Sequence, residues 1–320
     1  MLSRAADAIY WMNRYVERAE NIARFIQVNL HLSLDQPMQM RSEQWAPLVK
    51  VTGDYDRFLE RYGEATQESV IDFLTFDREY PNSIISCLDR ARENARSVRQ
   101  IISSEMWQQI NTFFLMVSGV HKGIALEVPD DFFARIQMVC HTFTGIMSAT
   151  MSHGEAWHFG RIGAMLERAD KTSRILDVKY FILLPQVQDV GTPYDNIQWS
   201  ALLKSASAFE MYRKKYGRIE PRDVAAFLIL DPEFPRSIHY CLLEVERSLH
   251  LITGTPANTF GNEAERRVGR LRSGLVYTDI GEIIDQGLHQ FLDGLQAQLN
   301  AVNDGVAQSF FPVNPTISND

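Results

Sequence analysis

The sequence has no long apolar run and few cysteines, and each absence excludes a class of protein. No stretch of 18 apolar residues occurs, so the chain is not expected to span a membrane. The opening MLSRAADAIYW is amphipathic and charged, unlike the apolar core of a signal peptide. Cys87, Cys140 and Cys241 are far apart and form no C-x-x-C pair, which is typical of reduced thiols. We therefore expect a cytoplasmic protein that is neither exported nor membrane-spanning.

Positive charge and nucleotide-binding motifs are also scarce. The 32 Lys and Arg residues are outnumbered by 40 Asp and Glu, which gives a formal net charge of −8. This balance argues against a protein that binds nucleic acid or anionic membranes. The motifs G-x-x-x-x-G-K-[ST], G-x-G-x-x-G, H-E-x-x-H and G-x-S-x-G do not occur. A nucleotide hydrolase, a zinc protease and a serine hydrolase are therefore not expected, and neither is a cofactor.

One Glu-x-x-His pair, Glu155 and His158, has the spacing used in helical metal sites. Di-iron sites in helical bundles need two such pairs and two further Glu residues. The N-terminal half has no counterpart, so the pair is better explained as polar residues at the start of a helix. We expect no metal.

Helical periodicity runs through almost all of the 320 residues. In the first segment it is carried by Ile9, Met12, Val16, Ala19, Ala23, Ile26 and Leu30. No segment alternates with period two over the length of a strand, so the fold class is predicted to be all-α. The predicted helices cover residues 3–33, 43–60, 66–76, 81–103, 104–122, 129–150, 154–184, 196–216, 221–230, 235–253, 262–277 and 280–305.

An internal repeat divides the chain. The segments FLTFDREYPNSIISCL from Phe73 and FLILDPEFPRSIHYCL from Phe227 share nine of sixteen positions at an offset of 154. Farther upstream, VERAENIARFIQV from Val16 matches LERADKTSRILDV from Leu166 at an offset of 150. We predict two diverged helical repeats, residues 1–152 and 153–308, that pack as one pseudo-twofold bundle, followed by a tail at 309–320.

The conserved spacing within the repeat includes the motif D-x-E-[Tyr/Phe]-Pro-x-Ser-Ile, which begins at Asp77 and again at Asp231. Proline is tolerated in the first turn of a helix, and acidic residues there complement the helix dipole. The motif is therefore interpreted as a structural helix start at Pro81 and Pro235.

A charged stripe recurs in both repeats. On a helix, the side chains of four residues of the first repeat fall within an arc of about 100°: Glu17, Glu20, Asn21 and Arg24. The second repeat places four residues in the same way: Glu167, Asp170, Lys171 and Arg174. Arg18 and Arg168 directly follow the first acid of each stripe. Three interpretations stay open, namely a ligand pocket, a buried structural ion pair and an exposed face with i,i+4 pairs. In a pocket, carboxylates would bind amide or ammonium groups and arginines would bind carboxylates, which suits a peptide or amino-acid ligand. Paired carboxylates also suit acid–base chemistry, with Glu17 and Glu167 as the catalytic candidates.

The segments MLSRAADAIYWMNRYVERAENIARFIQVN and WHFGRIGAMLERADKTSRILDVKY resemble the bacterial alpha-E family, which is named for its helical content and an E-R motif. The motif falls on Glu17 and Arg18 and on Glu167 and Arg168. His158 stands where the family has an Arg, which puts in doubt any role that needs a cation there. The resemblance implies ATP-grasp amide or peptide ligases as partners, in systems that add a transglutaminase-like peptidase or a proteasome-like hydrolase.

The expected function is therefore an accessory subunit that binds or presents a peptide or amino-acid substrate to an ATP-grasp ligase. Two alternatives stay open. One is an enzyme that uses the Glu-Arg carboxylates for amide chemistry, and the other is a helical scaffold. If the motifs serve one purpose, Glu17 and Glu167 should lie close together, with Arg18, Arg24, Arg168 and Arg174 completing a shared polar cleft.

Overall fold

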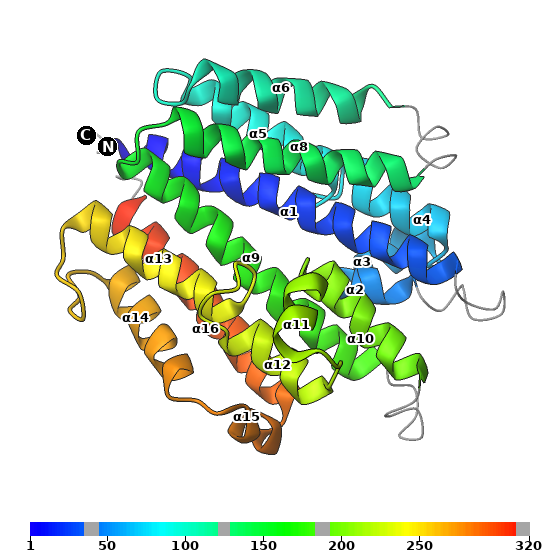
Figure 1. The fold of residues 1–320 in the computed structure, drawn as a ribbon. Helices are drawn as coiled ribbons and strands as arrows, with labels where there is room; N and C mark the ends of the chain where they lie inside the picture. The colour runs from blue at the N-terminus through cyan, green and yellow to red at the C-terminus, as the bar shows by residue number, and fades with distance from the viewer. Residues whose placement is uncertain (35–44, 121–128, 183–192, 312–320) are drawn as a thin grey trace.

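The computed structural model describes residues 1–34, 45–120, 129–182 and 193–311, and every regular element within these ranges is a helix (Figure 1). The prediction of an all-α fold is confirmed. In the N-terminal half the elements are α1 (Ser3–Leu34), α2 (Ala46–Thr52), α3 (Tyr55–Tyr62), α4 (Gln67–Ile71), the π-helical turn η3 (Asp72–Phe76), α5 (Ile84–Ser97), α6 (Ser104–Ser118) and α8 (Pro129–Thr150).

The C-terminal half begins with a second long helix. Its elements are α9 (Glu155–Ile182), α10 (Pro193–Ser205), α11 (Phe209–Tyr216), α12 (Pro221–Leu230), α13 (Ile238–Thr253), α14 (Glu263–Val276), α15 (Ile280–Gln286) and α16 (Leu288–Phe310). None of the described helices is long and apolar enough to cross a lipid bilayer.

Three predicted helices are each broken into two. The predicted helix 43–60 is interrupted at Gly53, which adopts a left-handed conformation with φ of 81°. A new helix, α3, begins at Tyr55. The predicted helix 196–216 is interrupted near Ser207, whose φ is 50°. The predicted helix 280–305 is broken at Gly287, where φ is 100°. Beyond this break α16 continues to Phe310, so the first residues of the predicted tail are helical, while residues 312–320 lie outside the described residues.

The repeated D-x-E motif forms the same turn in both halves. The carboxylate of Asp77 accepts hydrogen bonds from the backbone N–H groups two and three residues later (2.9 and 3.3 Å), and Asp231 does the same (2.8 and 2.8 Å). The hydroxyls of Ser83 and Ser237 donate to the carbonyls of these aspartates and cap the following helices. The structural interpretation is supported, but α5 and α13 begin after the serines and not at Pro81 and Pro235.

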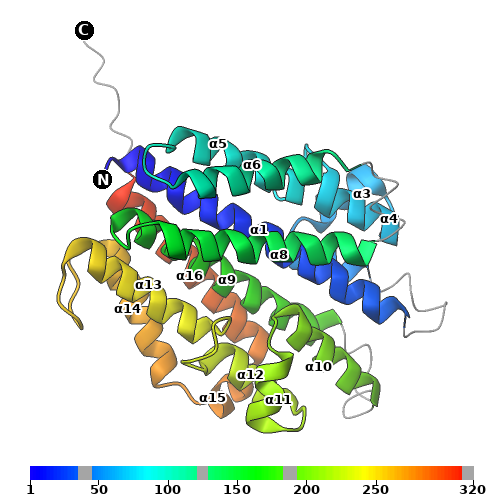
Figure 2. The same cartoon turned by 45° about the horizontal axis from the view of Figure 1, so that its top comes forward.

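Helices α1 and α9 lie side by side through the middle of the molecule (Figures 1 and 2). They run in the same direction, because the Met1 amino group contacts Glu155 (2.6 Å) near their starts and Arg14 contacts Glu167 farther along. The close approach requires glycine on α9. A Cβ atom on Gly163 would lie 2.3 Å from the carbonyl oxygen of Tyr10.

Each central helix has the same set of neighbours in its own half. Helix α1 packs against α5 and α8, which α6 covers, and helix α9 packs against α13 and α16, which α14 covers. The helices that follow the central pair cross over, because α2 packs against α9 and α10 packs against α1. The two halves thus share one continuous apolar core.

Candidate functional site

The charged stripes on α1 and α9 face inward. Glu17, Glu20 and Arg24 are 2–4% exposed, and Glu167 is fully buried. The interpretation of the stripes as an exposed face is therefore wrong. Both helices cross at this point, so the buried side chains of one stripe lie against the other helix.

The two Glu-Arg motifs pair with each other across the α1–α9 interface. The Nε and Nη2 atoms of Arg168 donate to the two carboxylate oxygens of Glu17 (3.0 and 2.8 Å). The same atoms of Arg18 donate to Glu167 (2.6 and 2.9 Å). Each helix therefore supplies the acid for one two-pronged ion pair and the base for the other, a geometry that adds orientation to charge.

Additional arginines complete the coordination of both glutamates. Arg14 donates from Nε and Nη2 to one oxygen of Glu167 (3.0 and 2.9 Å). Arg236, in the turn before α13, donates from Nη1 to Glu17 (2.9 Å). Both oxygens of each glutamate are thus occupied by guanidinium groups.

The second acids of the stripes bind bases on their own helices. Glu20 contacts Arg24, four residues later, and also accepts from Nη2 of Arg236 (2.6 Å). Asp170 accepts from Nε of Arg174 (2.9 Å), again four residues later. Of the four arginines expected in a shared cleft, Arg18 and Arg168 lie at the interface between the helices, whereas Arg24 and Arg174 remain with their own helices.

These contacts hold the carboxyl groups in their ionised form. Burial raises the pKa of Glu17, but the opposite effect of Arg168 and Arg236 is larger, so the net shift of the pKa is downward. In the same way, burial is outweighed by Arg18 and its neighbours at Glu167, whose pKa lies well below its usual range. General acid–base catalysis needs a carboxyl whose pKa is near the working pH, and opposed shifts mark an acid and a base. The pKa values of Glu17 and Glu167 are both lowered, which favours a structural ion pair over catalytic chemistry.

The bases are also affected by one another. The pKa of Arg18 is raised, because Glu167 more than offsets the burial of the guanidinium. Burial and the neighbouring Arg236 lower the pKa of Arg24 to about 10, which leaves it charged at neutral pH.

We call the charged residues of the two stripes, together with the bases that contact them, the Glu-Arg cluster. Among the described residues it contains seven bases and four acids: Arg14, Arg18, Arg24, Arg168, Lys171, Arg174 and Arg236 with Glu17, Glu20, Glu167 and Asp170.

Sequence reasoning missed Arg14, Arg236 and His141. Arg14 lies one helical turn before Arg18, and this spacing could have indicated it. Arg236 aligns with Asn82 in the repeat, so a search for charges kept in both copies passes over it. His141, on α8, contacts Glu20 (3.0 Å) from a different element, and no sequence signal indicated that contact.

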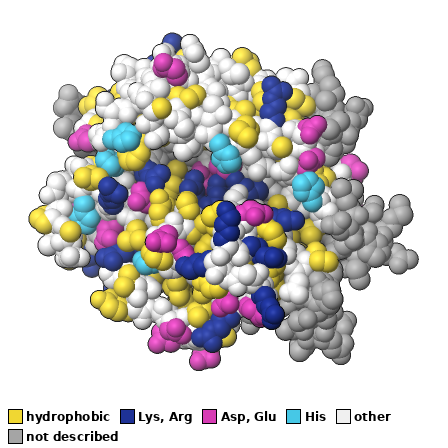
Figure 3. Space-filling view, in the orientation of Figure 1, with side chains coloured by type: hydrophobic (Ala, Val, Ile, Leu, Met, Phe, Trp, Pro, Cys, Tyr) yellow, Lys and Arg dark blue, Asp and Glu magenta, His cyan; other side chains and the backbone are white. Residues whose placement is uncertain are grey.

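Charged side chains also reach the surface close to the centre of the molecule. Figure 3 shows Lys and Arg side chains gathered there among Asp and Glu side chains, around a hollowed part of the face seen in Figure 1. No group of three or more His, Cys, Asp and Glu residues in the described part of the chain could hold a metal ion. Glu155 contacts the Met1 amino group and His158 contacts Ser248 (3.3 Å), so these two residues have separate partners.

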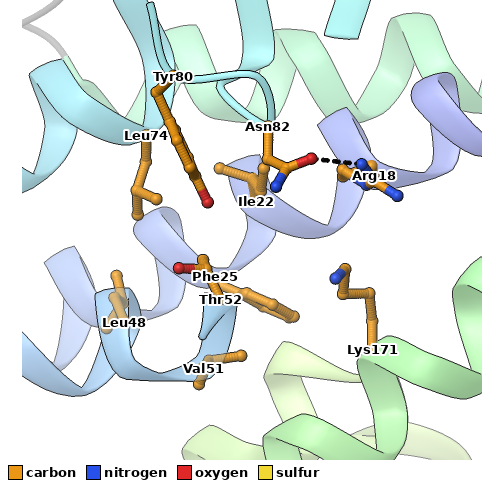
Figure 4. A pocket seen from close by; sticks show the side chains of 10 residues that line it. All are labelled: Arg18, Ile22, Phe25, Leu48, Val51, Thr52, Leu74, Tyr80, Asn82 and Lys171. Carbon is orange, nitrogen blue, oxygen red and sulfur yellow. Dashed lines mark hydrogen bonds between the residues drawn. The ribbon is translucent and has the colours of Figure 1, made fainter. Parts of the chain in front are cut away.

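A hollow of about 380 Å³, partly open to solvent, adjoins the Glu-Arg cluster (Figure 4). Arg18 and Lys171 stand at one side of it, with the amide of Asn82 above them. The opposite side is mainly apolar. It is formed by Ile22, Phe25, Leu48, Val51, Thr52, Leu74 and Tyr80.

The family described as a predicted alpha-helical domain with a conserved ER motif, Alpha-E, matches residues 1–311. The chain belongs to the Alpha-E family. The Glu-Arg pairs from which the sequence indicated this family lie at the α1–α9 interface. An uncharacterised protein of Mycobacterium bovis and two of Mycobacterium tuberculosis are each 26% identical to the chain over 330 residues. The match covers 94% of this chain but 36% of each relative, so the chain spans about a third of their length. No solved protein structure matches this Alpha-E chain.

Proposed function

We propose that this Alpha-E protein is an accessory subunit that binds or presents a peptide or amino-acid substrate to an ATP-grasp amide ligase. The observation that carries the proposal is the hollow beside the Glu-Arg cluster, where Arg18 and Lys171 face a mainly apolar wall. A cationic edge next to an apolar surface suits a ligand that joins a charged group to a side chain. Such a role requires a cytoplasmic location, because the ligase consumes ATP.

The choice of partner rests on the family resemblance. The transglutaminase-like peptidase and the proteasome-like hydrolase are proposed as further members of the same system on the same ground. The length of the mycobacterial relatives supports a role alongside another protein module, since nearly two thirds of each relative lies outside the matched region. The ionised, fully paired glutamates support an accessory role over a catalytic one.

We also propose that residues 1–152 and 153–308 are diverged copies related by an approximate twofold axis. Three observations support it: the same turn after Asp77 and after Asp231, the matching neighbours of α1 and α9, and the exchange of ion pairs between the two motifs. Under this proposal the Glu-Arg cluster is the element that fastens the two copies together.

A pull-down from the native cell tests the partnership. The tagged full chain serves as bait, and the bound proteins are identified by mass spectrometry at low and at moderate salt. We expect an ATP-grasp ligase among them. Recovery without any ligase under either condition would contradict the proposal.

A reconstituted assay then separates the accessory subunit from an enzyme. ATP consumption and amide formation are measured with the ligase alone, with this chain alone and with both. We expect product only when both are present. Turnover of peptide or amide substrates by the chain alone, abolished in Glu17→Gln, would instead support a catalytic role.

A further inference from the structure

Two positions near the Glu-Arg cluster carry an asparagine in the first repeat and a long basic residue in the second. At the offset of 154, Asn82 in the turn before α5 corresponds to Arg236 in the turn before α13. At the offset of 150, Asn21 on α1 corresponds to Lys171 on α9. Both asparagines therefore lie in the first half and both long basic residues in the second. Each turn lies near the central helix of the other half, so Arg236 contacts Asn21 on α1, while Asn82 lines the hollow together with Lys171 on α9.

The difference between Asn82 and Arg236 explains where the hollow lies. In the second half, the Arg236 guanidinium reaches inward, donating to the side-chain oxygen of Asn21 (3.2 Å) and to both Glu17 and Glu20 (2.9 and 2.6 Å). In the first half, the shorter Asn82 accepts from Nη1 of Arg18 (2.5 Å) and leaves the space in front of it open. Lys171 approaches that space from α9 (Figure 4).

The donors that remain at the hollow are few. Arg18 uses Nε and one hydrogen of Nη2 on Glu167 and one hydrogen of Nη1 on Asn82, so the second hydrogens of Nη1 and Nη2 are left. The ammonium group of Lys171 lies 3.1 Å from Asp170 and 3.6 Å from Glu167, which leaves one of its three hydrogens. These three hydrogens are sufficient for the two oxygens of a carboxylate. An inorganic phosphate ion would leave the apolar wall of the hollow uncovered.

We propose that the hollow binds the carboxylate end of a single amino-acid residue, either free or at the C-terminus of a peptide. The carboxylate lies at Arg18 and Lys171, and an apolar side chain packs against Ile22, Phe25 and Leu74. The hollow is small and partly open to solvent, which suits one residue and not a longer segment. This assignment deepens the proposed function and rests on it only for the ligand's role as a ligase substrate.

The difference between these two pairs supplies the test variant, which we call the exchange variant. Asn82→Arg combined with Lys171→Asn copies the pair of Arg236 and Asn21 into the hollow and leaves the net charge unchanged. We expect it to fold, because the molecule already accommodates Arg and Asn at the corresponding positions 236 and 21. The new guanidinium should fill the hollow.

Binding is measured by titration calorimetry on the full chain. The probes are N-acetyl-leucine, its neutral counterpart N-acetyl-leucinamide, and inorganic phosphate. We expect one equivalent of N-acetyl-leucine to bind, the amide to bind at least about tenfold more weakly, and phosphate not to compete at equal concentration. The exchange variant should lose N-acetyl-leucine binding with its melting temperature little changed.

Several outcomes would overturn the assignment. They are unchanged binding to the exchange variant, equal binding of the acid and the amide, and preferential binding of phosphate. If the exchange variant does not fold, Lys171→Gln replaces it, since this variant removes the charge at similar size and should weaken binding about tenfold. Lys214→Asn, on the exposed surface of α11, removes one positive charge elsewhere and should leave binding unchanged.

The result is independent of the ligase partner. Binding of N-acetyl-leucine without recovery of a ligase in the pull-down would leave the carboxylate site intact and refute the partnership. Recovery of the ligase without binding of N-acetyl-leucine would support the partnership and refute the carboxylate site.

Discussion

Replacing Glu167 with Gln should destabilise the protein strongly. The carboxylate is fully buried and accepts four N–H donors from Arg14 and Arg18, at 2.6–3.0 Å. Glutamine keeps one oxygen acceptor, but it removes the negative charge and leaves two arginines facing each other and Lys171. Breaking a buried ion pair by removing one partner costs about 3–5 kcal/mol. We expect Glu167→Gln to lower the free energy of unfolding by that amount, measured by urea titration with circular dichroism and tryptophan fluorescence as two probes.

The matched control for this experiment is Glu263→Gln. Glu263 also contacts two arginines, Arg266 and Arg267, but on the exposed side of α14, where water and salt screen the charges. We expect no resolvable change in stability for this variant. If Glu167→Gln unfolds at the same urea concentration as Glu263→Gln, the Glu-Arg cluster does not hold the fold together. Its carboxylates would then be available for chemistry, and the interpretation as a structural ion pair would be wrong.

Three further predictions concern the interior of the molecule. Folding lowers the pKa values of the four acids of the Glu-Arg cluster, so the stability that they add is complete above about pH 5 and is lost as the pH falls through their folded pKa values. The midpoint of thermal unfolding, measured from pH 7 to pH 3, should therefore stay constant at first and fall below about pH 4. A midpoint that rises on acidification would contradict this prediction. Gly163→Ala should destabilise the protein, because the Cβ atom of the new alanine would meet the carbonyl oxygen of Tyr10. The control is Gly274→Ala on α14, where a Cβ atom has no neighbour within 4 Å and should stabilise the protein by about 0.5–1 kcal/mol. Equal changes in melting temperature for the two variants would refute the close α1–α9 contact. Burial raises the pKa of the thiols of Cys87 to about 11 and Cys241 to about 12, so the native protein should not react with iodoacetamide at pH 8, while the unfolded chain should take up three equivalents by mass spectrometry.

Helical periodicity was sufficient to predict the long elements of the fold. The apolar spacing from Ile9 to Leu30 repeats without interruption, and α1 follows it from Ser3 to Leu34. The breaks within shorter helices were harder to predict. Gly53 and Gly287 are glycines within periodic segments, where a left-handed turn competes with continuation of the helix. The break at Ser207 has no glycine or proline to mark it, so it depends on tertiary packing.

The importance of the Glu-Arg motifs was predictable, but their pairing was not. Adjacent residues on a helix point about 100° apart, so Glu17 and Arg18 do not face each other. Their partners must come from another element, and the repeat indicated that this element carries Glu167 and Arg168. Which acid binds which base follows only from the crossing of α1 and α9. The hollow was unpredictable for a different reason, since it depends on a difference between the repeats at Asn82 and Arg236.

The central claim is that the two motifs bind each other across the α1–α9 interface, and a double-mutant cycle on Glu17 and Arg168 tests it most directly. The free energies of unfolding are measured for Glu17→Gln, Arg168→Met and the double variant. Because the pair is buried and two-pronged, each single change leaves a charge without its partner. We predict that the double variant is more stable than the sum of the single losses implies, by about 2–3 kcal/mol. Losses that add within about 0.5 kcal/mol would show that the two residues do not interact and would contradict the account.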